Sequence, residues 1–219
     1  MPGRTIAIGD VHGCSVALAA LLDLIRPRPD DTIVTLGDYI NRGPDSRGVL
    51  DRLIALAGQC RLVPILGNHD ESLRDLIRSG QPAYWWLGGD DAEDLGSFVT
   101  QAQVVPVSAA QADFLAGCRD FHETDAHIFT HGNYEADRPM AEQADETLRW
   151  LSLREATPGP HDSGKTVFVG HTAQKSGAIL DLGHLVCIDT YCWGGGRLTA
   201  LEVDTRRVWR VDREGRPRQ

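Results

Sequence analysis

Five short motifs place carboxylate, amide and imidazole side chains directly after apolar segments. They read GDVHG at 9–13, GDYINRG at 37–43, GNHD at 67–70, THG at 130–132 and GHT at 170–172. The polar residues that they supply are Asp10, His12, Asp38, Asn68, His69, His131 and His171. Oxygen and imidazole ligands without thiolates suit Mn, Fe or Zn, and this set is too large for one tetrahedral centre. The motifs therefore predict two ions that share a carboxylate, with Asp38 as the natural bridge.

Regular elements must bring these motifs together. The segments RTIAIGD, DTIVTLGD, RLVPILGN, AHIFTHG and KTVFVGH are apolar, rich in β-branched residues and short enough for buried strands. Apolar residues at helical spacing follow the first three, over 15–25, 46–57 and 71–77. This alternation predicts an α/β fold, in which ligands bind at the carboxyl ends of strands. One such motif alone is mostly turn chemistry, but five in this setting favour a single site.

The remaining chain divides into two stretches. Between 80 and 126 the pattern weakens, and we expect an inserted, substrate-facing cap within a single domain spanning 1–219. Its Tyr84, Trp85 and Trp86 could line a substrate groove, although packing explains such clusters more often. After KTVFVGHT, the segments GAILDLG, LVCIDTY, RLTALEVD and RRVWRVD predict a second, more antiparallel sheet packed against the first.

Composition excludes several classes of protein. With 219 residues, 42% hydrophobic and 24% charged, the chain can form a core without disulfides. Its five cysteines include no CxxC pair, which argues against a disulfide framework or a thiolate zinc site and fits a reducing compartment. We find neither a signal peptide nor an apolar run long enough for a membrane span, so we expect a cytoplasmic protein with no membrane partner.

Charge bears on the substrate. The formal net charge is −9 at pH 7, so the sequence has no basic footprint for a nucleic-acid partner. Two of the 22 basic residues are Lys and the other 20 are Arg, whose forked guanidinium suits phosphate. An acidic protein can still keep positive charge where an anion binds. The overall sign therefore does not exclude anionic substrates.

In their order and in their residues, the motifs resemble those of the calcineurin-like metallophosphoesterases. GDYINRGPDS and the closing IDTYCWGGGRLTALEV are similar to the phosphoprotein-phosphatase branch, which includes small bacterial and phage serine/threonine phosphatases. The closing segment also resembles the symmetrical diadenosine tetraphosphate hydrolases, a sister group. The resemblance implies an α/β fold in which two mixed β-sheets form a central sandwich flanked by helices.

The resemblance also implies a role for each motif residue. One ion would be held by Asp10, His12 and Asp38, and the other by Asp38, Asn68, His131 and His171. The cofactor would be two divalent ions, Mn²⁺ before Fe, Zn, Ni or Co, with a bridging hydroxide that attacks phosphorus. His69 resembles the general acid beside the leaving oxygen, and Arg42 resembles a phosphate clamp.

One position of the catalytic group departs from the family pattern. Protein phosphatases carry Asp in GDxVDRG, where this chain has Asn41. In the family that Asp orients the acid histidine, here His69. An amide can hydrogen-bond the ring, but it does not stabilise an imidazolium as a carboxylate does. We therefore expect weaker acid catalysis, felt most with poor leaving groups.

A second departure concerns the phosphate ligands. Relatives place a phosphate-binding Arg shortly after a Trp that follows the HG motif, and TLRWLSLREAT offers Arg149 and Arg154 around Trp150. Either could bind phosphate. The alternative is that both are solvated helix charges, paired with Glu146 or Glu155.

Three functions follow from these residues. The first is metal-dependent hydrolysis of phosphoserine or phosphothreonine, with a phosphorylated protein or a small phosphoester as substrate. The second is hydrolysis of dinucleoside polyphosphates, which the compact chain length favours less. The third is a non-catalytic metal-binding or partner-binding relative, with Asn41 as its first sign, and the complete ligand set argues against it.

Overall fold

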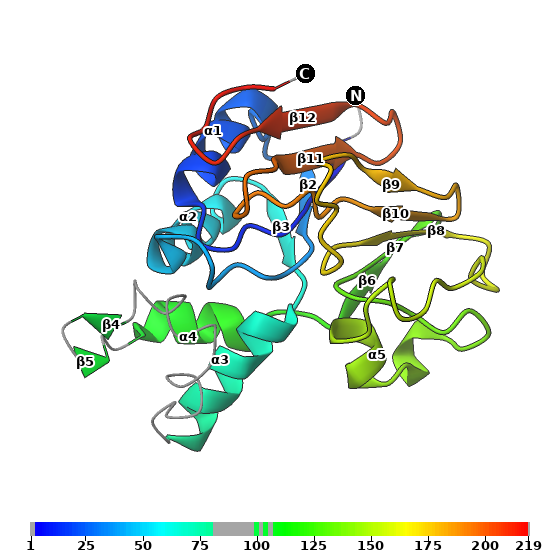
Figure 1. Cartoon of the computed structure of the whole chain (residues 1–219), viewed down its shortest axis with the longest axis horizontal. Helices are drawn as coiled ribbons and strands as arrows, with labels where there is room; N and C mark the ends of the chain where they lie inside the picture. Colours follow the sequence, from blue (N-terminus) through cyan, green and yellow to red (C-terminus); the bar gives the residue numbers. More distant parts are fainter. Residues whose placement is uncertain (1–2, 81–98, 101–102, 105–106, 219) are drawn as a thin grey trace.

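The computed structural model describes residues 3–80, 99–100, 103–104 and 107–218, and its strands form two five-stranded sheets packed face to face (Figure 1). The first sheet has the order β12-β11-β1-β2-β3. Its strands are β1 (Thr5–Ile8), β2 (Thr32–Thr35), β3 (Arg61–Pro64), β11 (Leu198–Glu202) and β12 (Val208–Val211). The first three are parallel, whereas β11 is antiparallel to β1 and β12 is antiparallel to β11.

The second sheet has the order β6-β7-β8-β10-β9. Its strands are β6 (Phe121–Glu123), β7 (His127–Thr130), β8 (Thr166–Val169), β9 (Leu180–Asp181) and β10 (Leu185–Cys187). Strands β7, β8 and β10 are parallel, and antiparallel β6 and β9 form the edges. Both sheets are mixed, which confirms the predicted fold class.

The last two strands differ from the sequence-based expectation. The segments RLTALEVD and RRVWRVD form β11 and β12, which join the first sheet, where Ile8 pairs with Ala200. Burial explains this placement. Leu198 and Ala200 pack on the helix side of the sheet, whereas Leu201 packs between the two sheets. A strand that is apolar on both faces needs cover on both, which the interior of the first sheet provides.

Helices cover the outer face of the first sheet. Helix α1 (Ser15–Ile25) and helix α2 (Ser46–Ala57) have the predicted bounds and bury Leu18, Leu21, Val49, Leu50 and Leu53 against it. The Asp45 side chain caps α2 by accepting a hydrogen bond from the backbone N–H of Gly48 at 2.8 Å. On the second sheet, the 3₁₀ turn η2 (Met140–Glu142) and helix α5 (Asp145–Arg149) supply Met140 and Leu148 to the outer core.

Two further helices flank the stretch predicted as a cap. Helix α3 (Asn68–Ser79) begins three residues earlier than predicted, and helix α4 (Ala109–Ala116) contacts both α2 and α3 and buries Leu115 in the main core. Strands β4 (Val99–Thr100) and β5 (Gln103–Val104) pair with each other. Residues from 109 onward thus belong to the core layers. Tyr84–Trp86 lie outside the described residues, so the cap and its role in a single domain stay predictions.

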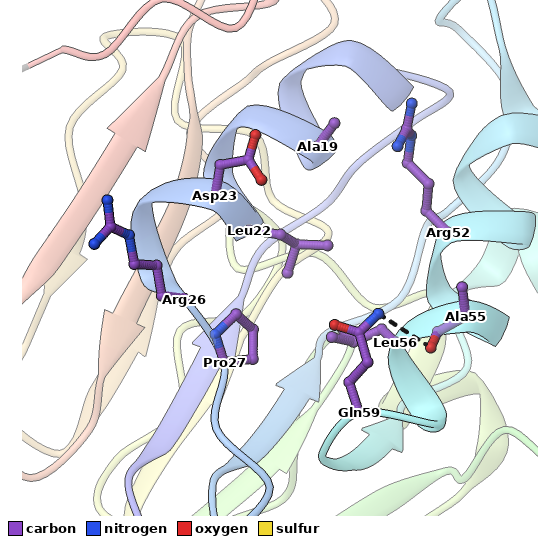
Figure 2. Close-up of a pocket in the computed structure, with 9 residues that line it drawn as sticks. All are labelled: Ala19, Leu22, Asp23, Arg26, Pro27, Arg52, Ala55, Leu56 and Gln59. Carbon is purple, nitrogen blue, oxygen red and sulfur yellow. Dashed lines mark hydrogen bonds between the residues drawn. The ribbon is translucent and has the colours of Figure 1, made fainter.

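A groove of 630 Å³ lies between α1 and α2 (Figure 2). Leu22 and Leu56 line it, and Arg26 and Arg52 stand at its sides. It contains none of the predicted site residues, so it is separate from the chemistry that the motifs predict. Among the described helices, none is long and apolar enough to cross a membrane.

Candidate active site

The five motifs converge where the parallel strands of both sheets end. A pocket of 240 Å³ there is lined by motif residues from four loops: His12, Asp38, Arg42, Asn68, His69 and His171. Asp10 and His131 lie beneath it and are buried. Asp10 Oδ2 accepts a hydrogen bond from the backbone N–H of His171 at 2.9 Å, which joins the first motif to the last.

The backbone of these loops is held in the left-handed region. His12, Asp38, Asn41, Arg42 and His171 have φ between 43° and 69°. Such conformations cost non-glycine residues about 1–2 kcal/mol and persist only where the surroundings impose them. Glycines leave the necessary room, because a Cβ on Gly170 would lie 2.1 Å from Asp10 Oδ1. The chain therefore bears strain in order to aim these side chains.

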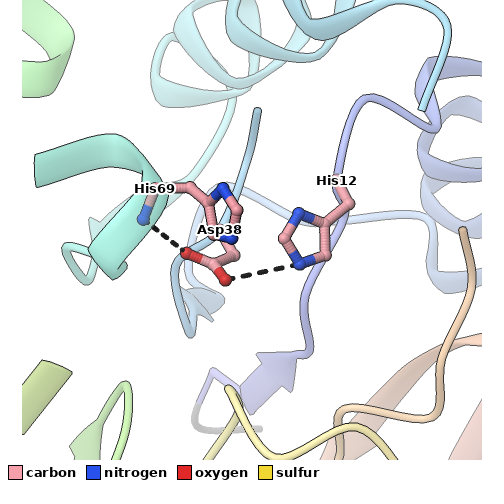
Figure 3. A group of neighbouring side chains, drawn as sticks. All are labelled: His12, Asp38 and His69. Atoms are coloured by element: carbon pink, nitrogen blue, oxygen red, sulfur yellow. Dashed lines mark hydrogen bonds and ion pairs between the residues drawn. The ribbon is translucent and has the colours of Figure 1, made fainter. Parts of the chain in front are cut away.

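Asp38 is at the centre of the cluster. Its Oδ2 lies 3.3 Å from Nε2 of His12, and its Oδ1 lies 3.4 Å from Nε2 of His131. The backbone N–H of His69 donates to Oδ1 at 3.2 Å, and Figure 3 shows Asp38 between His12 and His69. Two groups with metal-ligand spacing share this carboxylate: His12, Asp38 and His69, and Asp38, His131 and His171.

Three histidines turn one ring nitrogen outward to the backbone and the other inward. His12 Nδ1, His131 Nδ1 and His171 Nε2 lie 2.9, 2.7 and 3.0 Å from the carbonyl oxygens of Ile40, Leu36 and Trp150. A carbonyl only accepts, so these contacts assign the ring proton to the outer nitrogen. In the neutral rings the inner nitrogens then direct lone pairs at oxygen atoms, an arrangement that a bound cation stabilises, whereas, despite burial, the Asp38 carboxylate raises the pKa of His131. Metal-binding histidines are commonly held in this way.

Asn68 supplies an oxygen to the second group. Its Oδ1 lies 3.1 Å from His131 Nε2 and 3.1 Å from His171 Nδ1. Burial lowers the pKa of His171 to about 4 and that of His12 to about 3, so both rings are neutral near pH 7. Neutral imidazole is the form that binds metal.

Buried carboxylates add negative charge to the same place. Burial, then Asp189 and Asp38, raises the pKa of Asp10 well above its usual range. Burial and Asp38 also raise the pKa of Asp70 to about 7, and burial raises that of Asp189 to about 6. Asp10 Oδ1 is buried and has no hydrogen-bond partner among the described residues. Divalent cations would compensate this charge, so the residues fit the two-metal centre.

Two consecutive residues contact the ring of His69. Asn41 Nδ2 lies 3.0 Å from Nδ1, and Arg42 Nη2 lies 3.4 Å from Nε2. The Arg42 guanidinium also stacks on Trp193, with its central carbon 4.6 Å from the ring centroid. Its Nε is buried and unpartnered in the described part of the chain. Trp193 thus holds Arg42 at the pocket, and the Nε–H group of Arg42 can still donate a hydrogen bond to a ligand.

The two candidate phosphate ligands have different surroundings. The Arg149 side chain is 1% exposed and lies 2.7–2.8 Å from carboxylate oxygens of Glu71, Asp120 and Asp145. It does not line the pocket, so the expectation that it binds phosphate, or is a solvated charge paired with Glu146, does not fit this structure. The reason is that its guanidinium forms ion pairs with three acids, two of them distant in sequence. Arg154 is exposed, lines the pocket and donates to the carbonyl of Ala173.

Further pocket residues received no role from the sequence. They are Ala173, Lys175, Asp189, Tyr191 and Trp193. Asp189 follows β10 as the other site carboxylates follow their strands, so the strand-end rule could have found it in IDTYCW. Asp70 accepts hydrogen bonds from the N–H groups of Tyr39 and Gly67, at 3.0 and 3.1 Å, and thereby ties the GNHD loop to the GDYINRG loop.

A sheet sandwich with paired metal-ligand groups at its strand ends fits a metal-dependent enzyme. The chain belongs to the calcineurin-like phosphoesterase family, whose model matches residues 3–189. This confirms the resemblance found in the motifs. The family binds two divalent metal ions.

Relatives come from two branches of this family. Serine/threonine-protein phosphatase 1 of Salmonella typhimurium is 28% identical over 202 residues, which cover 90% of each chain. A symmetrical bis(5'-nucleosyl)-tetraphosphatase of Methylobacillus flagellatus is 28% identical, with 94% of each chain covered. The crystal structure of a candidate diadenosine tetraphosphatase superposes with a TM-score of 0.71 at 24% identity, covering 100% of this chain and 96% of that one. This structural likeness supports the fold alone.

Proposed function

We propose that this chain hydrolyses phosphoesters at a two-metal centre in which Asp38 is the shared ligand. Asp10 and His12 would complete one site, and Asn68, His131 and His171 the other, with Mn²⁺ as the first candidate ion. The observation that carries the proposal is the inward lone pairs of His12, His131 and His171 around Asp38 and Asn68. Metal ions bound between these nitrogens and oxygens would make that arrangement favourable.

Each remaining residue has a role in phosphoryl transfer. Two divalent ions, when bound, lower the pKa of a coordinated water and neutralise charge on the phosphoryl oxygens. Arg42 would bind a phosphoryl oxygen from its position on Trp193, and Arg154 would approach from the opposite loop. His69 would donate a proton to the leaving oxygen, held by Asn41 through Nδ1.

Two substrate classes have support. Phosphoserine and phosphothreonine in proteins are the first class, supported by the Salmonella phosphatase, which aligns over 90% of both chains. Dinucleoside tetraphosphates are the second class, supported equally by the Methylobacillus relative, which aligns over 94% of both chains, and by a second cavity that shares Lys175 with the pocket. The five cysteines are free thiols, which supports a cytoplasmic location.

The test is turnover of three substrates by Mn²⁺-loaded protein: a phosphoserine peptide, diadenosine tetraphosphate and p-nitrophenyl phosphate. We expect hydrolysis of p-nitrophenyl phosphate, loss of activity with EDTA, and a fall of about 10²-fold or more in kcat with His69→Asn on the phosphopeptide. A folded, metal-loaded protein that hydrolyses none of the three would overturn the proposal and support the binding-protein alternative.

A further inference from the structure

A second cavity, of 320 Å³, adjoins the active-site pocket. Lys175 lines both. Beyond it the cavity is bordered by glycines of the loops at 177 and 195–196 and by Arg197, at the start of β11. A ligand that reaches out of the pocket past Lys175 would approach this cavity.

The cavity carries excess positive charge. Its two acids are already paired, since Asp212 accepts from Arg216 at 2.8 Å and from Arg218, and Glu214 accepts from Arg216 at 2.8 Å. Neither Lys175 nor Arg197 has a carboxylate within 4.0 Å among the residues that the structure describes. These two cations thus keep their charge for a ligand.

A neighbouring arginine strengthens the field. Arg210 lies on β12, next to β11, and its carbonyl accepts from the N–H of Arg218 at the cavity. Burial and the Arg197 guanidinium lower the pKa of Arg210, and its Nε is buried without a hydrogen-bond partner in the described ranges. Guanidinium groups that repel each other are stabilised when an anion binds between or beside them.

The cavity suits a small and densely charged group. Gly195 has φ of 99°, and a Cβ there would meet nothing within 4 Å, so the loop leaves open space. The N–H groups of Gly194 and Gly196 already donate to the carbonyl of Tyr191, so side chains must supply the contacts. Charged side chains around open space favour a phosphoryl group over an extended peptide backbone, which needs free backbone donors and acceptors.

We propose that Lys175 and Arg197 form a second anion-binding subsite, which takes a phosphoryl group that the substrate carries besides the hydrolysed one. This inference rests on the proposed phosphoester hydrolysis. Such a group has two sources: the next phosphoryl of an oligophosphate chain, or a second phosphorylated side chain of a protein. The subsite would make substrate choice depend on the number of phosphoryl groups.

The experiment compares kcat/KM for substrates with several phosphoryl groups and with one. Diadenosine tetraphosphate and a doubly phosphorylated peptide are compared with p-nitrophenyl phosphate and a singly phosphorylated peptide, using wild type, Arg197→Gln, Arg197→Lys and Lys175→Gln. Arg52→Gln is the matched control, because it removes one exposed positive charge at the groove between α1 and α2 (Figure 2). Thermal melting checks that each variant is folded.

In Arg197→Gln and Lys175→Gln we expect the ratio of kcat/KM for multiple over single phosphoryl groups to fall about tenfold, with partial recovery in Arg197→Lys. A fall in this ratio for diadenosine tetraphosphate alone would show that the subsite binds an oligophosphate chain. A fall for the peptide pair alone would show that it binds a second phosphorylated side chain of a protein. A ratio that stays constant, or falls equally in Arg52→Gln, overturns the subsite.

A binding measurement distinguishes failure of the subsite from failure of the proposed function. If wild type hydrolyses no substrate, the proposed function fails, and the subsite is then read from the affinity for inorganic tripolyphosphate with Mn²⁺ in excess. Arg197→Gln should raise its Kd about five- to tenfold relative to Arg52→Gln. Equal Kd values in the two variants would contradict the subsite whatever the activity.

Discussion

The side-chain nitrogen of Asn41 lies 3.0 Å from Nδ1 of His69, in the position where the resemblance to protein phosphatases implies a carboxylate. Asn41 Oδ1 is buried and has no partner in the described part of the chain. As oriented, the amide donates to the ring, whereas a carboxylate would accept from it. The contact holds the imidazole in place but does not stabilise its protonated form.

Asn41→Asp should therefore improve acid catalysis. Asp tolerates the left-handed φ of 69° at this position, so the loop is expected to keep its shape. We expect kcat to rise roughly three- to tenfold on a phosphoserine peptide, a poor leaving group, and to change by less than about twofold on p-nitrophenyl phosphate. An unchanged or lower rate on the peptide would show that Asn41 does not limit proton donation.

Trp193 should act through Arg42 and not through the reacting atoms. Its ring lies under the guanidinium at 4.6 Å, a contact worth about 0.5–2 kcal/mol. Trp193→Leu should raise KM for p-nitrophenyl phosphate about three- to tenfold with a smaller change in kcat, and Trp193→Phe should recover part of the loss. If the Leu variant lowers kcat at constant KM, this positioning role is wrong.

Substitution of Arg149 should lower the stability of the fold, whereas substitution of Arg154 should weaken substrate binding. Arg149→Met removes a buried guanidinium that pairs with Glu71, Asp120 and Asp145, although Glu71 keeps Arg74, and should lower the free energy of unfolding by roughly 1–3 kcal/mol in urea titrations. Arg154→Met should change it by less than about 0.5 kcal/mol, because the side chain is exposed, and should raise KM instead. A stable Arg149→Met variant with weakened phosphate binding would reverse the two roles.

Acid should weaken the fold through Asp31. Burial alone would raise the pKa of this carboxyl, but hydrogen bonds from Arg4 and Arg28 hold the pKa well below its usual range. A lowered folded-state pKa means that the stabilisation is complete above the unfolded value of about 4 and is lost as the pH falls below it.

The measurement is urea unfolding of metal-free wild type and Asp31→Asn. We expect wild type to be more stable by roughly 2 kcal/mol at pH 7, with the gap narrowing by at least about 1 kcal/mol at pH 3. Other carboxylates titrate equally in both proteins, so the difference isolates Asp31. A gap that stays constant between these pH values would exclude this contribution.

Local patterns predicted much of the fold. The bounds of α1 and α2 follow from apolar spacing, which is a local property of the chain. The predicted helix begins at 71, because Asn68, His69 and Asp70 are polar and carry no apolar spacing. In the structure α3 begins at Asn68. The pairing of β11 with β1 joins segments almost 200 residues apart, which no local pattern specifies.

The site likewise contains residues that local patterns predict and residues that depend on contacts between distant parts of the chain. Asp10, His12, Asp38, Asn68, His131 and His171 could be predicted to meet, because each follows the carboxyl end of a parallel strand, although the strands belong to two sheets. The burial of Arg149 depends on Glu71 and Asp120, which are distant in sequence. The contact of Trp193 with Arg42 likewise joins two loops whose approach only the folded chain reveals.

The two-metal centre around Asp38 is tested most directly by adding Mn²⁺ to metal-depleted protein while following both bound metal and hydrolysis of p-nitrophenyl phosphate. We expect two Mn²⁺ per chain, the electron paramagnetic resonance signal of a coupled pair, and activity that follows the second ion. Asp38→Asn should remove the coupled signal and the activity together. Binding of a single ion at full activity, or turnover in the metal-depleted protein, would contradict a two-metal centre.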